Sequence, residues 1–284
     1  MLSVVLIFSI ITFNRNKVWE NDITLFTDAL KNNPTLDIAY YNRGIAKEKI
    51  KDFEGALSDF NETIRVNKKY YEAYYRRAGV RVAMNNFNDA VNDYNVFIQQ
   101  NPKISIAYFN RGNAKVKLLD YKGAAEDFEY SIRESPDFVE AHNNLGNAKL
   151  NLQDYKGAID AMNKAIELNP KIPETYFNRG DAKFNLGDVK GAMDDYTQTL
   201  ILNPNYIEGY IHRGNANGAL QQFKNAIDDF SKAIELNPNY GYAYSLRGNA
   251  KLYSNINSNA CDDWKMAVSL GYSGAEGMLK THCK

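Results

Sequence analysis

Few side chains in this sequence are placed for catalysis or metal binding. Its histidines are His142, His212 and His282, and no two stand four residues apart, the spacing at which a helix face offers two metal ligands. Cys261 and Cys283 are too far apart for a Cys-x-x-Cys motif. We therefore predict no catalytic residue, no metal site and no cofactor.

Pairs of adjacent aspartates resemble acid and base partners at first sight. They are Asp194-Asp195, Asp228-Asp229 and Asp262-Asp263, and successive pairs are 34 residues apart. Such regular spacing indicates a solvated helix face in a repeated structure. The glycines recur too, in Arg-Gly-Asn-Ala segments, and so do not form a phosphate-binding loop. The sequence thus predicts a protein that is not an enzyme.

The charge balance also excludes a class of partner. Lys and Arg together number 34, as do Asp and Glu, so no basic field points to nucleic acid. Aromatic residues are plentiful, with 20 Tyr and 14 Phe. This composition suits helices that pack on other helices, or a groove that holds a protein or peptide.

Three columns of residues recur every 34 positions and reveal a repeat protein. The small residues are Gly44, Ala78, Gly112, Gly146, Gly180, Gly214 and Gly248. The alanines are Ala56, Ala90, Ala124, Ala158, Ala192, Ala226 and Ala260. The prolines are Pro34, Pro102, Pro136, Pro170, Pro204 and Pro238. We expect the small column and the alanine column to face each other where two helices cross.

Each repeat has the apolar spacing of two amphipathic helices. Asp52, Asp120 and Asp154 precede the second helix and are expected to cap it, whereas the proline at the end of the repeat stops it. The 34-residue period and the order of small residue, alanine, aromatic residue and proline resemble the tetratricopeptide repeat family. Its tryptophan is replaced by Tyr in six repeats and by His142 in the fourth.

The resemblance implies an all-α fold, a right-handed superhelical solenoid of antiparallel helix pairs. Its expected parts are an apolar segment over residues 1–19, a half repeat over 20–36, seven repeats over 37–270 and a capping helix over 271–284. We number these repeats 1 to 7, beginning at Asp37.

Comparison of the repeats with one another predicts ion pairs. An Arg precedes the small column in every repeat except the fourth, which has Leu145. Sixteen residues later stands an Asp, again except in the fourth repeat, which has Ala161. We infer that each Arg pairs with the Asp of its own repeat, as a surface pair that sets helix register more than it adds stability.

In this family the first helix of each repeat lines a groove for a peptide or helix, and helical spacing places positions two, five, nine and twelve along it. The resulting groove candidates are Tyr41, Tyr75, Phe109, Asn113, Asn143, Asn147, Phe177, Asp181, Asn215 and Asn249. Aromatic rings bury apolar side chains, and carboxamides pair with peptide groups. The alternative is that the aromatics pack on adjacent repeats. The lysine of the family's carboxylate clamp is absent at position five, which disfavours chaperone tails as ligands.

Residues 1–13 are apolar and uncharged, and Asn14 to Lys17 and Trp19 resemble an interfacial boundary. Three interpretations stay open: the end of a membrane span, a short anchor, or a helix packed on the first repeat. We predict a membrane-associated, bacterial-type protein tethered through residues 1–19, with neither membrane side favoured.

Cys261 and Cys283 lie eleven residues on either side of Tyr272, so an antiparallel helix pair brings them together. A disulfide would require an oxidising compartment, and two free thiols are the competing interpretation. The leading hypothesis for the chain is a membrane-tethered protein-interaction scaffold, with no oligomeric state indicated. The alternative is the repeat portion of an O-mannosyltransferase-like membrane glycosyltransferase, which the order of apolar span, Asn-Arg-Asn-Lys-Val-Trp and repeats resembles.

Overall fold

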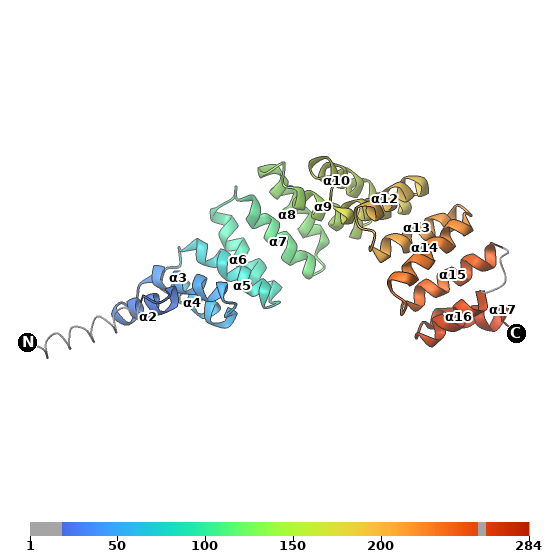
Figure 1. Cartoon of the computed structure of the whole chain (residues 1–284). Helices are drawn as coiled ribbons and strands as arrows, with labels where there is room; N and C mark the ends of the chain where they lie inside the picture. Colours follow the sequence, from blue (N-terminus) through green and yellow to red (C-terminus); the bar gives the residue numbers. More distant parts are fainter. Residues whose placement is uncertain (1–18, 255–259, 284) are drawn as a thin grey trace, which may run out of the picture. The chain divides into compact units, whose positions relative to one another are not determined.

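The computed structural model describes residues 19–254 and 260–283, which contain helices and turns only. Successive helices pack in pairs (Figure 1), which confirms the predicted all-α solenoid of helix pairs. The chain divides into two compact units, an N-terminal unit that ends at Pro136 and a C-terminal unit that begins at Asp137. Repeats 1 to 3 belong to the first unit and repeats 4 to 7 to the second.

The first helices of the seven repeats begin at equivalent positions. They are α3 (Asp37–Lys49), α5 (Tyr71–Ala83), α7 (Ser105–Lys117), α9 (Val139–Asn151), α11 (Pro173–Asn185), α13 (Ile207–Ala219) and α15 (Gly241–Tyr253). The second helices are α4 (Phe53–Val66), α6 (Phe87–Gln100), α8 (Tyr121–Glu134), α10 (Tyr155–Leu168), α12 (Val189–Leu202), α14 (Phe223–Leu236) and α16 (Ala260–Ser269). Helix α2 (Asp22–Asn32) precedes them, and η2 (Ser273–Ala275) and α17 (Glu276–His282) follow.

Local sequence explains where the second helices begin. The side chains of Asp52, Asp120 and Asp154 each accept a hydrogen bond from the backbone N–H three residues later, which confirms the predicted caps. In repeats 1 to 6, whose turns the structure describes, one residue before the second helix lies in the left-handed region. Among these repeats only repeat 5 has a glycine there, Gly187, whereas repeat 3 holds Leu119 at φ 62°.

The small column lets a bulky side chain of the second helix lie against the first helix. A Cβ atom built on Gly112 would stand 2.8 Å from the Phe128 ring, and one on Gly214 would stand 2.5 Å from Phe230. The expected partner was the alanine column, and the structure corrects this. The ring sixteen residues after the glycine fills the crossing, and alanine contributes a backbone oxygen beside it, as Ala192 does near Gly180.

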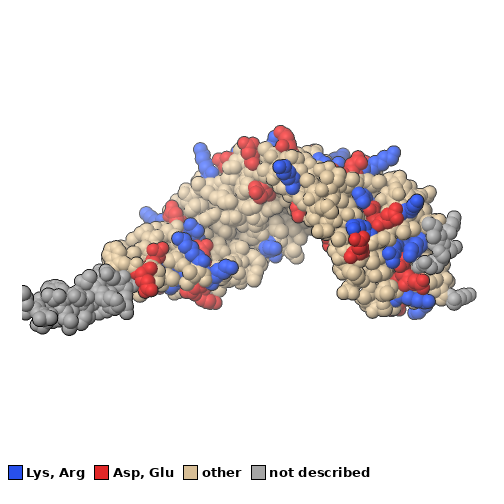
Figure 2. Space-filling view, in the orientation of Figure 1, with Lys and Arg blue, Asp and Glu red and all other residues tan. Residues whose placement is uncertain are grey.

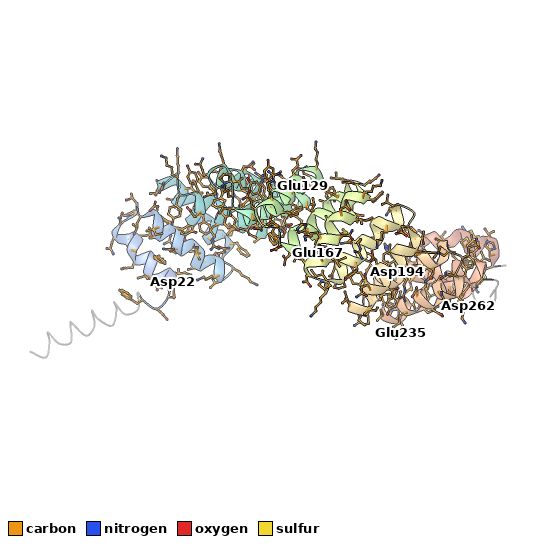
Figure 3. The ribbon with its side chains drawn as sticks, turned by 90° about the horizontal axis from the view of Figure 1, so that it is seen from above. Asp22, Glu129, Glu167, Asp194, Glu235 and Asp262 are labelled. Atoms are coloured by element: carbon orange, nitrogen blue, oxygen red, sulfur yellow. A yellow bond between two sulfur atoms is a disulfide. The ribbon has the colours of Figure 1, made fainter. Side chains whose placement is uncertain are left out.

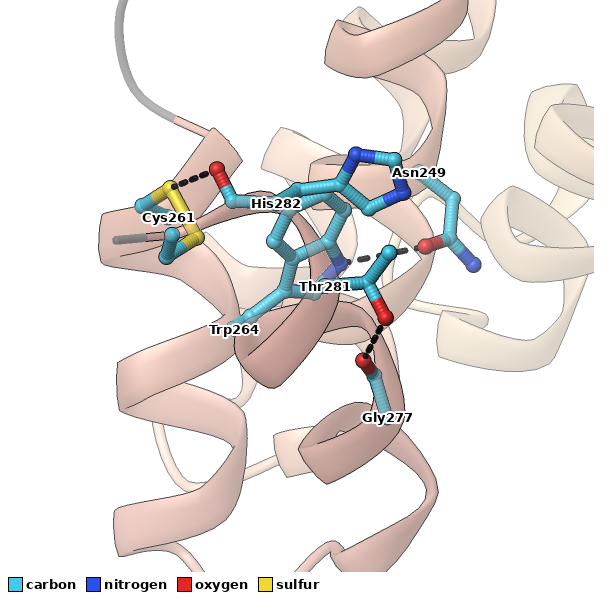
Figure 4. The surroundings of a disulfide bond; sticks show 7 residues. Asn249, Cys261, Trp264, Gly277, Thr281 and His282 are labelled. Carbon is cyan, nitrogen blue, oxygen red and sulfur yellow. Dashed lines mark hydrogen bonds between the residues drawn. A yellow bond between two sulfur atoms is a disulfide. The ribbon is translucent and has the colours of Figure 1, made fainter.

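The last helices close the C-terminal end. Trp264 is fully buried against Gly248, and its Nε1 donates a hydrogen bond to Asn249. Cys261 on α16 and Cys283 after α17 are joined by a disulfide (Figure 4). Met278 and Leu279 of α17 pack into this cluster, so α17 covers the apolar side of the last repeat.

The prediction of a membrane-associated chain is wrong, because no helix in the described ranges 19–254 and 260–283 has both the length and the apolar character to cross a membrane. The predicted tether covered residues 1–19, of which 1–18 lie outside these ranges.

Candidate functional site

In six repeats an Arg of the first helix pairs with an Asp of the second. The pairs are Arg43–Asp59, Arg77–Asp93, Arg111–Asp127, Arg179–Asp195, Arg213–Asp229 and Arg247–Asp263, with N–O distances of 2.5 to 2.6 Å. The predicted ladder is confirmed. Its predicted surface character is wrong, because every Asp is only 1 to 5 % exposed. These are buried carboxylates that depend on their partners.

Each buried carboxylate collects further partners that the sequence analysis missed. A second cation, four residues after the Arg, pairs with the same Asp at 2.6 to 2.9 Å; these cations are Lys47, Arg81, Lys115, Lys183 and Lys251. In repeat 6 Asn217 donates to Asp229 instead. Residues four apart share a helix face, so both cations of one helix point the same way.

The Arg also connects to the preceding second helix. Arg111 Nη1 donates to Asn95 and Arg179 Nη1 to Asn163, both at 2.7 Å. The Arg lies over the Tyr ring three residues before it, as Arg179 does over Tyr176 at 5.4 Å. A signal for this was present in the sequence: repeat 4 lacks Arg, Asp and Tyr together.

The two aspartates of a doublet differ in exposure, which corrects the prediction of one solvated face. Asp194 and Asp262 point outward from α12 and α16 (Figure 3) and are exposed. Asp195 and Asp263 are buried and hold the ion pairs. On the face seen in Figure 2, acidic and basic side chains are interspersed, so the outer surface carries both signs.

The exposed side of the first helices, here called the first-helix face, holds the groove candidates. Consecutive first helices contact one another, α3 with α5 in the N-terminal unit and α9 with α11 and α11 with α13 in the C-terminal unit. Tyr41, Tyr75, Phe109 and Asn113 belong to the N-terminal unit, and the other six candidates belong to the C-terminal unit.

The position-five aromatics are half-buried and make ring contacts within the chain. The ring centre of Tyr41 lies 4.8 Å from that of Tyr70, and the ring centre of Phe177 lies 5.1 Å from that of Tyr206. Tyr70 and Tyr206 directly precede the first helix of the next repeat. Tyr75 contacts Tyr94 and Phe97, and Phe109 lies 5.9 Å from Phe128. Tyr41 and Phe177 thus contact the start of the next repeat, whereas the ring contacts of Tyr75 and the contact of Phe109 with Phe128 lie within their own repeats. All four rings are half-buried.

In repeat 4 the carboxamides at positions five and nine bond to the next repeat. Asn143 accepts from Thr175 at 2.9 Å, and Asn147 accepts from Asn178 at 2.7 Å. Asn178 stands at position six, which the predicted stripe did not include. Position six lies about 100° around the helix from position five, outside the predicted stripe, and only the structure shows that it reaches back to the preceding repeat.

The Asp181 carboxylate has two side-chain partners. Its Oδ1 accepts from the Tyr196 hydroxyl at 2.8 Å and lies 2.7 Å from His212 Nδ1. Burial, followed by the negative charge of Asp181, raises the pKa of Tyr196 well above its usual value, so the hydroxyl stays protonated and donates.

Carboxylates gather near this cluster. Burial raises the pKa of Tyr206 to about 12, and the negative charges of Glu174 and Glu208 add to the rise. Both glutamates are exposed, and neither has an ion-pair partner among residues 19–254 and 260–283. The same ranges contain no group of three or more His, Cys, Asp or Glu that could hold a metal ion.

Two family models, both described as tetratricopeptide repeat, match the chain. One matches residues 75–137, 109–173 and 144–207, and the other matches 207–240. Together the matches run from residue 75 to 240, more than half of the 284 residues. A comparison with curated proteins gives no match.

Solved structures with the same fold are distant in sequence. The C-terminal part of a TPR repeat-containing protein from Cytophaga hutchinsonii is 21% identical, with TM-score 0.69 over 85% of this chain and 100% of that one. A tetratricopeptide repeat protein from Parabacteroides merdae is 18% identical, with TM-score 0.64 over 87% and 99%. MamA from Desulfovibrio magneticus is 19% identical, with TM-score 0.58 over 60% and 96%. None of these three is described as a glycosyltransferase, so that alternative gains no support.

Proposed function

Because this chain belongs to the tetratricopeptide repeat family, we propose that it acts as a non-enzymatic scaffold that holds an extended peptide or a helix of a partner protein on its first-helix face. One observation carries the proposal. Half-buried rings and carboxamides follow one another along the first helices, as Phe177, Asn147 and Asn215 do in the C-terminal unit.

The chemistry of this face suits a polypeptide ligand. Rings whose edges are exposed bury apolar side chains, and a carboxamide offers one donor and one acceptor group to a peptide bond. The ring contacts within the chain hold these side chains in place before a ligand arrives, which lowers the entropy that binding must overcome.

Site-specific photo-crosslinking in the cells that produce the protein tests the proposal. A benzophenone side chain would be placed in the full chain at Asn147 or Asn215 on the first-helix face. Matched controls carry it at Glu167 of α10 or Glu235 of α14, two exposed second-helix positions labelled in Figure 3. We expect a discrete crosslinked product at the first pair of positions, and mass spectrometry of the product should identify one defined polypeptide segment.

Crosslinking of the same segment with equal yield at Glu167 and Glu235 would overturn the proposal, as would products from all four positions that share no segment. Either result would move recognition away from the first-helix face.

A further inference from the structure

A pocket opens on the first-helix face between repeats 6 and 7, within the C-terminal unit. It has a volume of about 200 Å³. Its floor is made by Ala226 and Phe230 of α14 and Ala250 of α15, which are buried. At its rim Phe223 and Tyr253 stack with their ring centres 5.7 Å apart.

The pocket exists because repeat 6 has a glycine where the other repeats have a larger side chain. Position twelve is occupied by Glu48, Val82, Val116, Leu150, Phe184, Gly218 and Leu252 in turn. A Cβ atom built on Gly218 would meet nothing within 4 Å. The missing side chain therefore leaves open space, and glycine in a helix interior is destabilising by about 1 kcal/mol relative to alanine.

A second departure from the repeat pattern falls at the same place. In repeats 4 and 5 the position-nine side chain is hydrogen-bonded by position six of the next repeat, Asn147 by Asn178 and Asp181 by His212. For Asn215 that neighbour is Leu246, which cannot form a hydrogen bond. Of residues 19–254 and 260–283, none hydrogen-bonds the Asn215 carboxamide, which lines the pocket.

Among the described residues, the unpaired charges of α11, α13 and α15 have one sign. The cations Arg179, Lys183, Arg213, Arg247 and Lys251 of α11, α13 and α15 all point to the buried aspartates. Glu174 and Glu208, both exposed, remain on the first-helix face with no ion-pair partner in the part of the chain that the structure describes. This face of the C-terminal unit is therefore complementary to a basic ligand.

Spacing along α13 relates the acidic end to the pocket. Glu208, His212 and Asn215 stand at i, i+4 and i+7 and so share one face of the helix. At a helix rise of about 1.5 Å per residue, Glu208 lies about 10 Å from Asn215 and about 15 Å from Gly218 along the axis. Because Asn215 and Gly218 both line the pocket, its middle lies about 12 Å from Glu208 along the axis. An extended peptide at about 3.3 Å per residue covers about 12 Å in three or four residues.

We propose that the Gly218 pocket receives an aliphatic or aromatic side chain of an extended peptide that carries Lys or Arg three or four residues away. The Asn215 carboxamide pairs with the backbone beside the apolar residue, and Glu208 and Glu174 attract the basic one. This assignment rests on the proposed function and names the ligand chemistry and the repeat pair that recognises it.

A selection from a phage-displayed library of random nine-residue peptides on the full chain tests the proposal. Enriched peptides would be synthesised with a fluorescein label, and their affinities measured by fluorescence anisotropy for the wild type and for variants. Gly218→Leu fills the pocket, and Leu150 and Leu252 at the same position show that the helix accepts leucine. Gly79→Leu is the matched control, because Gly79 also lies on a first helix with open space around it.

We expect enriched peptides to combine an apolar residue with Lys or Arg three or four positions away. Gly218→Leu should weaken their binding by about 10- to 100-fold, the equivalent of one buried apolar side chain, whereas Gly79→Leu should change it by less than about 2-fold. The double variant Glu174→Gln with Glu208→Gln should weaken binding by about 3- to 10-fold and reduce its dependence on salt.

Other outcomes overturn the assignment in distinguishable ways. Peptides that bind Gly218→Leu as well as the wild type would refute the pocket and leave the proposed function standing. Peptides without a basic residue would refute the charge assignment. Self-association in sedimentation velocity that Gly218→Leu abolishes would assign the pocket to a second copy of the chain. No enrichment over bare matrix would count against both the pocket and the proposed function.

Discussion

Repeats 4 and 5 are neighbours in the C-terminal unit, and their helices have equal lengths, 13 residues for α9 and α11 and 14 for α10 and α12. They differ in what lies between the two helices. Repeat 5 has Arg179 and Asp195 in contact, whereas repeat 4 has Leu145 and Ala161 at these positions, both buried.

The difference shows that the helix pair does not need the buried charges to form. A buried ion pair loses hydration free energy that its mutual attraction only partly restores, and well-packed apolar residues often replace it without loss. The buried carboxylate does determine where the Arg and Lys side chains of the first helix point. In repeat 5 Arg179 and Lys183 are both held toward α12, and the first-helix face keeps the negative charge of Glu174.

The largest expected effect comes from removal of the shared carboxylate in repeat 5. Asp195→Ala leaves Arg179 and Lys183 without the carboxylate that they share, in a space that is largely shielded from water. Both cations are partly exposed, 16% and 20%, so we expect a loss near the lower end for a broken buried pair, about 3 kcal/mol in the free energy of unfolding. Urea denaturation followed by circular dichroism measures it.

Two variants define the comparison. Asp194→Ala removes the exposed neighbour and should change the free energy of unfolding by less than about 0.5 kcal/mol. Arg179→Leu combined with Asp195→Ala copies repeat 4 and should restore stability to within about 1 kcal/mol of the wild type. A double variant as unstable as the single one would show that repeat 4 depends on something other than this exchange.

An intermediate effect is expected where the second helix presses on the glycine column. A Cβ atom on Gly180 would stand 2.7 Å from Tyr196, which is fully buried and held by its hydrogen bond to Asp181. We expect Gly180→Ala to lower the free energy of unfolding by about 1–2 kcal/mol, even though alanine favours a helix by about 1 kcal/mol. Thermal melts followed by circular dichroism check this.

Repeat 4 again supplies the control. Gly146 faces Met162, an unbranched side chain that can move aside, so Gly146→Ala should be nearly neutral. Repeat 2 already carries Ala78 in one cluster with Tyr94, whose hydroxyl forms no hydrogen bond with the described residues. Equal losses from Gly146→Ala and Gly180→Ala would mean that ring fixation by Asp181 has no part in the effect.

The comparison between repeats also shows what the sequence could predict. The joint absence of Arg and Asp from repeat 4 was sufficient to infer the ion pairs, because two residues that are lost together imply contact. Lys183 was missed because repeat 4 keeps Lys149 at the equivalent position although the Asp is absent. The burial of Asp195 was missed because it stands beside Asp194, and adjacency alone does not tell which of two residues faces the core.

The candidate site was less predictable than the fold. Helical spacing placed Asn147 and Asp181 on the first helices, yet their partners Asn178 and His212 stand at a position that the stripe omitted. Contacts between repeats depend on how one helix pair is placed on the next, which periodicity does not specify. Gly218 illustrates the same limit, because a glycine signals open space only after its neighbours are located.

The smallest effect is expected in repeat 6, whose buried Asp229 pairs with one cation, Arg213, whereas Asp195 of repeat 5 pairs with two and repeat 4 has no such Asp. There Asn217 replaces the second cation: its Nδ2 donates to Asp229 at 2.9 Å, and its Oδ1 is buried without a hydrogen-bond partner among the described residues. Asn217→Lys should place an ammonium group where Lys183 and Lys251 stand in the adjacent repeats. Because an unpaired buried oxygen is destabilising, we expect the free energy of unfolding to rise by about 1 kcal/mol.

The control for Asn217→Lys separates charge from hydrogen bonding. Asn225 lines the same hollow as Asn217 but is exposed. Asn225→Lys adds a positive charge near Asp229 and leaves the buried oxygen as it is, so its effect on urea denaturation should stay below about 0.5 kcal/mol. If Asn217→Lys and Asn225→Lys raise the free energy of unfolding equally, the added positive charge accounts for the effect and the buried Asn217 oxygen does not. Repeats 4 and 5 would then differ in the number of charges they carry and not in whether their buried polar groups are hydrogen-bonded.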